Sequence, residues 1–339
     1  MLDVFEQDST YLLNKLTLPN LDGSQILLTG SSGLIGRNIL NFLNTLLLSR
    51  RFTFTVDALS MNTMRNQNKY HRNVEFKKGD LSLGLEDFSL KKYNYIIHAA
   101  TYGQPGKFTA QPLETLSLNG TLVIELAKHL DSQGTFLFLS SSEIYVGSTT
   151  APNVETDLGK VSIESPRAAY VYGKIFGEVA LMQMRDRFQV RIGRIALSYG
   201  PGTKLGDSRV LNQLIYRGMT EGKIELADSG KALRTYCYVR DTIEMLLNVF
   251  FWGRSEIYNI GGVSSVSIRE LGEEISKIMN VPFSFPSAIG IHPDAPEQVK
   301  LDTSKYRNEF GEVAFIKLSE GLKRTVEWQR TALFEGKDL

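Results

Sequence analysis

The fold is decided by residues 25–36, Gln25-Ile26-Leu27-Leu28-Thr29-Gly30-Ser31-Ser32-Gly33-Leu34-Ile35-Gly36. The apolar run at its start predicts a buried strand, and the leucines at Leu40, Leu43 and Leu47 predict a helix after it. Glycines between the two allow a sharp turn, a close approach to a pyrophosphate, and tight packing of helix on strand. The N-terminus of such a helix favours an anion. Strand, loop and helix together predict a dinucleotide-binding site.

The residues expected to hold the dinucleotide cluster at this loop and at the ends of later strands. They are Gly30, Ser32, Gly33, Leu34, Ile35 and Gly36, then Ala99, Ala100 and Thr101 after the fourth strand. Asp80 and Leu81 end the third strand, where Asp80 either bonds the adenine amine or belongs to a simple turn.

An acid at the end of the second strand is expected to hold the ribose. Asp57 is one candidate, but a strand that runs on to Leu59 puts Ser60 in that place, so both stay open. No arginine directly follows either position, and a 2'-phosphate needs a guanidinium. The sequence therefore favours NAD over NADP.

Strands and helices alternate from residue 25 to about 199, which predicts an α/β fold with a doubly wound parallel Rossmann-type sheet and a smaller C-terminal substrate lobe. We expect a helical extension over residues 1–23, an NAD-binding domain over 24–198, and a substrate lobe over 199–339. A strand near 234–262 partly returns to the first domain. Two long helices are predicted, over 116–130 and 170–185.

Composition narrows the classes of partner. The 339 residues carry a formal net charge of +1, so no overall field attracts nucleic acid or a membrane surface. A single cysteine suits a reducing compartment, the start of the chain is acidic, and no apolar run reaches membrane-spanning length. These features predict a cytoplasmic protein without an anchor. The four histidines are scattered, so no metal site is expected.

Tyr170 and Lys174 are predicted to lie one helical turn apart on one face. A phenol with a pKa of about 10 is a poor base, and a neighbouring cation favours its ionised form. A tyrosinate prepared in this way can take a proton from a sugar hydroxyl while the carbon gives a hydride to a nicotinamide. Serines 140–142 end a buried strand upstream, where a hydroxyl can share that proton.

Several motifs occur in the order seen in extended short-chain dehydrogenases. They are residues 29–36, His98-Ala99-Ala100, residues 140–145, Tyr170 with Lys174, Tyr199-Gly200-Pro201, residues 234–241, and Tyr258-Asn259-Ile260-Gly261-Gly262. Over residues 24 to about 310 the chain resembles the NAD-dependent epimerase and dehydratase family, which rebuilds nucleotide sugars. Within it, the chain is most similar to UDP-glucuronate decarboxylases and nucleotide-sugar 4,6-dehydratases.

The resemblance implies a Ser141, Tyr170 and Lys174 triad, with Tyr170 as the base and Lys174 also bonding the nicotinamide ribose. The family oxidises the sugar at C4 with tightly held NAD, after which its members epimerise, dehydrate or decarboxylate. Glu143 resembles the glutamate of dehydratases and decarboxylases, which assists at C5 or helps to distort the ring; a solvated loop acid is the alternative. Serine at Ser142 is shared with decarboxylases and GDP-mannose dehydratases.

On the substrate side, Ser142, Arg209 and Arg234 are expected to contact a nucleotide-diphosphate sugar, because a guanidinium pairs two phosphate oxygens at once. Either arginine can instead belong to an ordinary salt bridge. Two positions depart from the family pattern. Leu197 stands where an asparagine is usual, and Val299 stands near the place of an arginine in decarboxylases.

The leading hypothesis is therefore an NAD-dependent enzyme that forms a transient 4-keto nucleotide sugar and then decarboxylates or dehydrates it. A 4-epimerase is the alternative within the family, and a non-catalytic NAD-binding sensor is the alternative from another class. The resemblance also implies a homodimer that pairs through the helices at 116–130 and 170–185.

Overall fold

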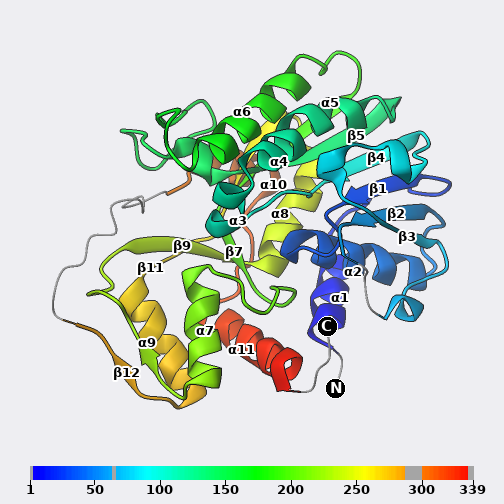
Figure 1. Ribbon diagram of the computed structural model, residues 1–339. Helices are drawn as coiled ribbons and strands as arrows, with labels where there is room; N and C mark the ends of the chain where they lie inside the picture. The colour runs from blue at the N-terminus through cyan, green and yellow to red at the C-terminus, as the bar shows by residue number, and fades with distance from the viewer. Residues whose placement is uncertain (1–2, 63–65, 287–299, 335–339) are drawn as a thin grey trace.

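The computed structural model describes residues 3–62, 66–286 and 300–334. Strands and helices alternate along most of the chain, as the sequence predicts. Figure 1 shows a large sheet flanked by helices and, beside it, a smaller group of helices and short strands.

Seven parallel strands form the large sheet in the order β10-β6-β5-β4-β1-β2-β3. They are β1 (Gln25–Thr29), β2 (Thr55–Ser60), β3 (Val74–Lys78), β4 (Tyr93–His98), β5 (Leu130–Ser141), β6 (Gln189–Ile195) and β10 (Ile257–Ile260). The chain runs outward from β1 to β3 and then returns to β4 on the other side of β1. This order confirms the predicted doubly wound parallel sheet.

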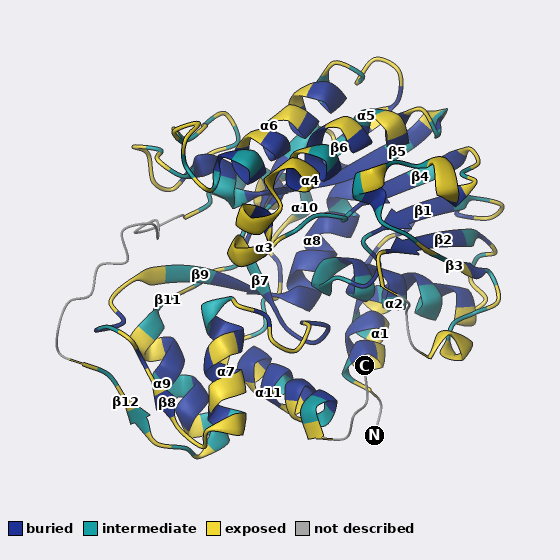
Figure 2. Ribbon diagram, in the orientation of Figure 1, coloured by how far each residue is buried: buried dark blue, intermediate teal, exposed yellow. Residues whose placement is uncertain are grey.

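Helices cover both faces of this sheet (Figure 1). One face is covered by α5 (Leu122–Ala127) and α6 (Ala168–Met182), the other by α2 (Leu34–Leu48) and α8 (Val239–Trp252). Because both faces are covered, the inner strands β1, β2 and β4 are mostly buried (Figure 2), whereas the edge strand β3 is partly exposed and carries charged residues. In the described part of the chain, no helix has the length and apolar character needed to cross a membrane.

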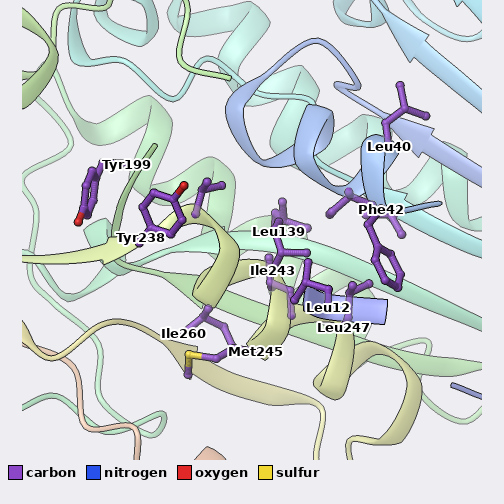
Figure 3. Close-up of a cluster of buried hydrophobic side chains, with 14 of the residues drawn as sticks. Leu12, Leu40, Phe42, Leu139, Tyr199, Tyr238, Ile243, Met245, Leu247 and Ile260 are labelled. Carbon is purple, nitrogen blue, oxygen red and sulfur yellow. The ribbon is translucent and has the colours of Figure 1, made fainter. Parts of the chain in front are cut away.

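The larger hydrophobic core lies on the α2 and α8 side of the sheet. Figure 3 shows Leu139 of β5 among Ile243 and Leu247 of α8, with Leu12 of the N-terminal helix α1 (Val4–Lys15) close by. A second core fills the opposite face beneath α5 and α6. The two cores fix both layers of helices to the sheet by burial of apolar surface.

The N-terminal helix is tied to distant parts of the chain. It packs on α2 and α8, and its buried Asp8 carboxylate accepts a hydrogen bond from the hydroxyl of Tyr238 at 2.8 Å. Arg324, on helix α11 (Leu318–Phe334), donates to the other Asp8 oxygen at 3.1 Å. Helix α1 is therefore held against the rest of the protein by the hydrogen bonds of the buried Asp8 carboxylate as well as by the packing of Leu12 in the core.

The smaller lobe follows β7 in the sequence. A three-stranded sheet of β11-β9-β7 and a short β12-β8 pair accompany its helices. The remaining elements are β7 (Leu197–Tyr199), α7 (Val210–Thr220), β8 (Ile224–Glu225), β9 (Leu233–Tyr238), β11 (Ser264–Ser267), α9 (Ile268–Met279), β12 (Phe283–Ser284) and α10 (Ser304–Phe310). Although α8 and β10 come late in the sequence, they pack on the large sheet or belong to it.

The helix predicted over 116–130 is shorter and interrupted. The chain forms α3 (Pro105–Ala110), α4 (Pro112–Leu116), a π-helical turn at Ser117–Thr121, and then α5, while residue 130 already starts β5. At the turn, the side-chain amide of Asn119 donates to the carbonyl of Thr115 at 2.8 Å, and Gly120 lies against the ring of Phe176 on α6. Apolar periodicity carries no signal for either contact, so the sequence did not predict the break.

A buried polar network lies beneath the carboxyl end of β5. Arg194 of β6 donates to both oxygens of Glu178 on α6, and its Nη2 lies 2.6 Å from Oε2. Ser140 donates to Oε1 of the same carboxylate at 2.5 Å. Arg194 also donates to the hydroxyl of Tyr145, which in turn donates to Asn259 of β10. The network connects α6 to three neighbouring strands, and its charged groups are paired and hydrogen-bonded as burial requires.

Removal of the guanidinium tests how much stability this network supplies. Arg194→Met leaves the Glu178 carboxylate buried without its cation, so we expect the free energy of unfolding to fall by about 3–5 kcal/mol. Urea unfolding followed by circular dichroism measures the change. Arg187→Met, at an exposed position, is the control and should shift the midpoint little. A loss below about 1 kcal/mol for Arg194→Met would contradict this account.

Candidate active site

A cavity of about 380 Å³ lies where the carboxyl ends of β1, β4 and β5 meet. Ligands of open α/β sheets bind at this place, where the strand order reverses. The predicted site residues that line it are Gly30, Ser32, Gly33, Leu34, Ile35, Gly36, Ser60, Asp80, Leu81, Ala99, Ala100, Thr101, Ser141, Ser142, Glu143, Tyr170, Lys174 and Arg209. Asp57 and Arg234 are the two predicted residues that do not line it.

The glycine loop is packed so closely that side chains are excluded at two positions. Gly30 has a φ of +70°, and a Cβ added there would lie 2.5 Å from the carbonyl oxygen of Ala99. A Cβ on Gly36 would collide with the carbonyl of Gly30. The first turn of α2 therefore opens directly onto the cavity, and it contains no acidic residue. These are the features that a dinucleotide pyrophosphate needs, so the loop fits the expected cofactor.

Asp57 is corrected as a ribose ligand. It lies inside β2, three residues before the strand ends at Ser60, and it is buried away from the cavity. Its carboxylate accepts a 2.6 Å hydrogen bond from Tyr93 and pairs with Lys77 at 2.9 Å and Lys91 at 3.4 Å. Burial opposes its charge, but these three partners outweigh burial and lower the pKa of Asp57. Ser60 is the strand-end residue that faces the cavity.

Asp80 has the turn contacts that one of its two interpretations predicts. Its carboxylate accepts hydrogen bonds from the backbone N–H of Ser82 at 2.9 Å and from the Ser82 hydroxyl at 2.7 Å. The same residue lines the cavity beside Leu81. Asp80 thus shapes the turn at the adenosine end, and its role toward an adenine stays a prediction.

Tyr170 is buried on the cavity wall. Its hydroxyl lies close to the side chain of Ser141, and its ring stacks on Phe108 of α3 with centroids 4.6 Å apart. Burial raises the pKa of Tyr170 to about 12, the nearby Ser141 side chain lowers it in part, Glu143 raises it further, and Arg209 lowers it. The phenol is therefore strongly held in its neutral form, and only nearby positive charge can make it a base.

Lys174 lies one turn further along α6 and is almost fully buried. Its ammonium donates to the carbonyl of Leu139 at 2.6 Å and lies 5.8 Å from the ring centroid of Tyr170. Burial lowers the pKa of Lys174 to about 7, while the Glu178 carboxylate raises it. The predicted pairing of Tyr170 and Lys174 on one face is present, with the lysine anchored to β5.

Glu143 lies next to Ser141 and makes an ion pair that the sequence did not predict. Its backbone N–H donates to Ser141 Oγ at 3.2 Å, and its carboxylate pairs with Arg167 at 2.6 Å. Arg167 precedes Tyr170 by three residues at the start of α6, so a helix-face comparison could have suggested it. No local sequence pattern would have suggested that Phe108 packs on Tyr170, because Phe108 lies on α3, after β4, far from Tyr170 in the sequence.

The two candidate substrate arginines differ in position. Arg209 lines the cavity and pairs side by side with Asp207 at 2.7 and 2.9 Å. Asp207 also accepts a 2.8 Å hydrogen bond from Gln104, at the N-terminus of α3, so the loop after β4 is linked to the small lobe. Arg234 lies on β9, is not among the residues that line the cavity, and donates to the carbonyl of Leu233, so its contact with a diphosphate stays a prediction.

The remaining expectations concern departures from the family pattern and metals. Leu197 lines the cavity on the small-lobe side, whereas Val299 lies outside the described residues. Within residues 3–62, 66–286 and 300–334, no three His, Cys, Asp or Glu side chains come together as a possible metal site.

The fold and this cavity define a dinucleotide-binding α/β protein with a Ser, Tyr and Lys constellation at the sheet edge. The model of the NAD dependent epimerase/dehydratase family matches residues 26–261. Because that match covers more than half of the chain, the protein belongs to this family. Membership confirms the expected family and the expectation of NAD as the cofactor.

Curated proteins are similar to this chain in sequence, and solved structures are similar to it in fold. UDP-glucuronic acid decarboxylase 3 of Arabidopsis thaliana is 27% identical over 91% of this chain and 89% of its own length. A dTDP-glucose 4,6-dehydratase from Streptomyces venezuelae, solved with NAD, has a TM-score of 0.76 at 20% identity, covering 92% of this chain and 99% of its own. MoeE5, solved with UDP-glucuronic acid and NAD, has a TM-score of 0.71 at 24% identity, covering 92% and 100%. At these identities the two structures show the shared fold.

Asp57→Asn tests the corrected role of that residue. We expect NAD affinity to change less than about twofold, because the side chain does not face the cavity, while stability at pH 7 falls by about 1.5–3 kcal/mol. Since the folded pKa of Asp57 is lowered, its contribution is fully present above the unfolded value of about 3.9 and is lost as the pH falls from there through the folded value. The gap in stability between wild type and variant should therefore narrow only as the pH falls below about 3.9.

Calorimetric titration with NAD and urea unfolding at several pH values measure both effects. A large loss of NAD affinity with unchanged stability would restore Asp57 as a cofactor ligand.

Proposed function

We propose that the protein is an NAD-dependent enzyme that acts on a nucleotide-diphosphate sugar through a transient 4-keto sugar and then removes a carboxylate from C5. The observation that carries the proposal is Glu143, which lines the cavity beside Ser141 and Tyr170. By the family resemblance, a simple 4-epimerase has no use for a second acid at this place, whereas decarboxylases and dehydratases do. The curated decarboxylase relatives favour decarboxylation of the two.

The glycine loop, Ser60, and the segment from Ala99 to Thr101 would hold the cofactor. When bound, NAD supplies a hydride acceptor and donor for C4 of the sugar. Tyr170 would take the proton of the C4 hydroxyl, and the Ser141 hydroxyl would orient that proton. Because burial raises the pKa of Tyr170, the Lys174 ammonium is needed close by to favour the phenolate.

Once C4 is a ketone, a carboxylate on C5 is the acid of a β-keto acid. The bond from C5 to the carboxylate breaks, carbon dioxide leaves, and the electron pair passes to the C4 oxygen as an enolate. A proton must then be added at C5 before the ketone is reduced. Glu143, on the same wall as Tyr170, is proposed to orient the ring for this step or to assist the proton transfer.

Arg209 is proposed to contact the diphosphate. Its guanidinium lies on the cavity wall and already holds a planar, two-oxygen partner in Asp207. A diphosphate oxygen pair has matching geometry and more negative charge. Ser142, also on the wall, is proposed as a sugar contact.

We also propose a homodimer in the cytoplasm. The outer sides of α4 and α6 expose the large apolar residues Leu113, Leu116, Tyr172, Phe176 and Val179, and Figure 2 shows exposed positions along α6. Pairing of these two helices with those of a second copy would bury that surface. The single Cys237 is buried and free, which agrees with a reducing compartment.

The products test the function directly. Purified protein incubated with UDP, dTDP, GDP and CDP sugars, including uronic acids, should release a product lighter by about 44 mass units from a nucleotide uronic acid. A loss of about 18 mass units would indicate dehydration instead, and an unchanged mass with altered retention would indicate epimerisation. Bound NAD without turnover of any sugar would favour the alternative, a non-catalytic NAD-binding sensor.

Two variants separate the steps of the reaction. Tyr170→Phe keeps the stacked ring but removes the base, so we expect C4 oxidation to slow by about 10²–10⁴-fold. Glu143→Gln should leave the rate of C4 oxidation near that of the wild type and slow formation of the decarboxylated product by about 100-fold. Absorbance of reduced nicotinamide reports the first step and mass spectrometry reports the product. Glu164→Gln, at an exposed position, is the control. Equal slowing of both steps by Glu143→Gln would contradict the C5 role.

A further inference from the structure

Four side chains, among them the phenol of Tyr170, form a cluster on the cavity wall. Phe108 stacks on Tyr170, the guanidinium of Arg167 lies 6.0 Å from the centroid of Phe108, and Arg167 pairs with Glu143 at 2.6 Å. Arg167 is not among the residues that line the cavity, whereas the other three are. It therefore lies beside the cavity wall, paired with Glu143 and near the ring of Phe108.

From this arrangement we infer that Arg167 is a positioning residue, which acts through Glu143 to hold that carboxylate in its working orientation for chemistry at C5. The inference rests on the proposed function, because it assigns Glu143 its task there. Nothing in the geometry brings the guanidinium itself to the reacting atoms.

The first argument is conformational. A glutamate side chain has three rotatable bonds, and a partly exposed one loses substantial entropy when it is fixed. About a quarter of the Glu143 side chain is exposed. Its carboxylate pairs with the Arg167 guanidinium, its backbone N–H donates to the Ser141 hydroxyl, and its carbonyl accepts from the N–H of Val146. Ser141 fixes the main chain, so the carboxylate depends on Arg167.

The second argument is electrostatic. The contact between the Arg167 guanidinium and the Glu143 carboxylate, at 2.6 Å, is a charge-assisted hydrogen bond, which is stronger than a bond between neutral groups. Arg167 therefore holds the carboxylate in one orientation more firmly than a neutral donor would.

The third argument is the rigidity of the support. The carbonyl of Arg167 accepts hydrogen bonds from the backbone N–H groups of Tyr170 at 3.1 Å and Val171 at 3.0 Å. Arg167 and Tyr170 therefore belong to the same first turn of α6. The helix that carries the base also carries the group that orients Glu143, so both are fixed relative to each other.

A double-mutant cycle with Arg167→Met and Glu143→Gln tests the inference on the full-length protein with NAD and a nucleotide uronic acid. Arg167→Met should slow product formation from C5 by about 100-fold while changing KM and C4 oxidation by less than about threefold. In the Glu143→Gln background, Arg167→Met should change the rate of product formation by less than about twofold, because the carboxylate that Arg167 orients is already absent. Arg167→Lys should form the product at least about tenfold faster than Arg167→Met.

Arg185→Met, an exposed arginine just beyond the end of α6, is the matched control and should retain wild-type rates. Thermal unfolding of each variant excludes a general loss of structure. Additive effects of the two substitutions, a large rise in KM, or equal slowing of both steps by Arg167→Met would each overturn the inference. Failure of the proposed function is distinct, since it would appear in the wild type as absence of the product lighter by about 44 mass units.

Discussion

One buried ion pair, between Arg194 of β6 and Glu178 of α6, sets the position of the helix that carries Tyr170 and Lys174 against the sheet. A buried ion pair is stable only when its geometry is good and its remaining polar atoms are hydrogen-bonded. Ser140 donates to the Glu178 carboxylate, and the Tyr145 hydroxyl accepts from the Arg194 guanidinium. Helix α6 therefore has one register against β5. That register brings Lys174 to the carbonyl of Leu139 and Tyr170 to the hydroxyl of Ser141.

The site next to this ion pair contains buried ionisable groups whose environment opposes their charged forms. Burial raises the pKa of Tyr170 and lowers that of Lys174, so both are driven towards their neutral forms. Glu143 adds a negative charge that opposes the phenolate, and Arg167 lies against that charge. The fold thus provides a wall where a few positive charges decide how strong a base the phenol becomes. The cavity wall opposite belongs to the loop after β4 and to the small lobe, which Gln104 and Asp207 connect.

Much of the site was predictable from the sequence because its signals are local. The glycine loop lies between an apolar strand and a helix, and Tyr170 and Lys174 are separated by one helical turn. Asp57 was wrong as a ribose ligand because its residue type and approximate position suited a ligand, whereas the register of β2 decided where that strand ends. Ser60 ends β2, and Asp57 lies inside it. The π-helical turn at 117–121 was missed because packing against Phe176, not periodicity, accompanies it.

The sequence by itself determined the alternation of strands and helices, the anion-binding loop and the placement of Tyr170 and Lys174 on one helix face, because each depends on residues within about one turn or one strand of each other. Only the tertiary structure decided that Arg167 meets Glu143, that Phe108 covers Tyr170, and that Gln104 reaches Asp207 across the cavity. These partners come from separate strand-end loops or helix starts. The packing of helices on the sheet brings them together, and no short stretch of sequence records that packing.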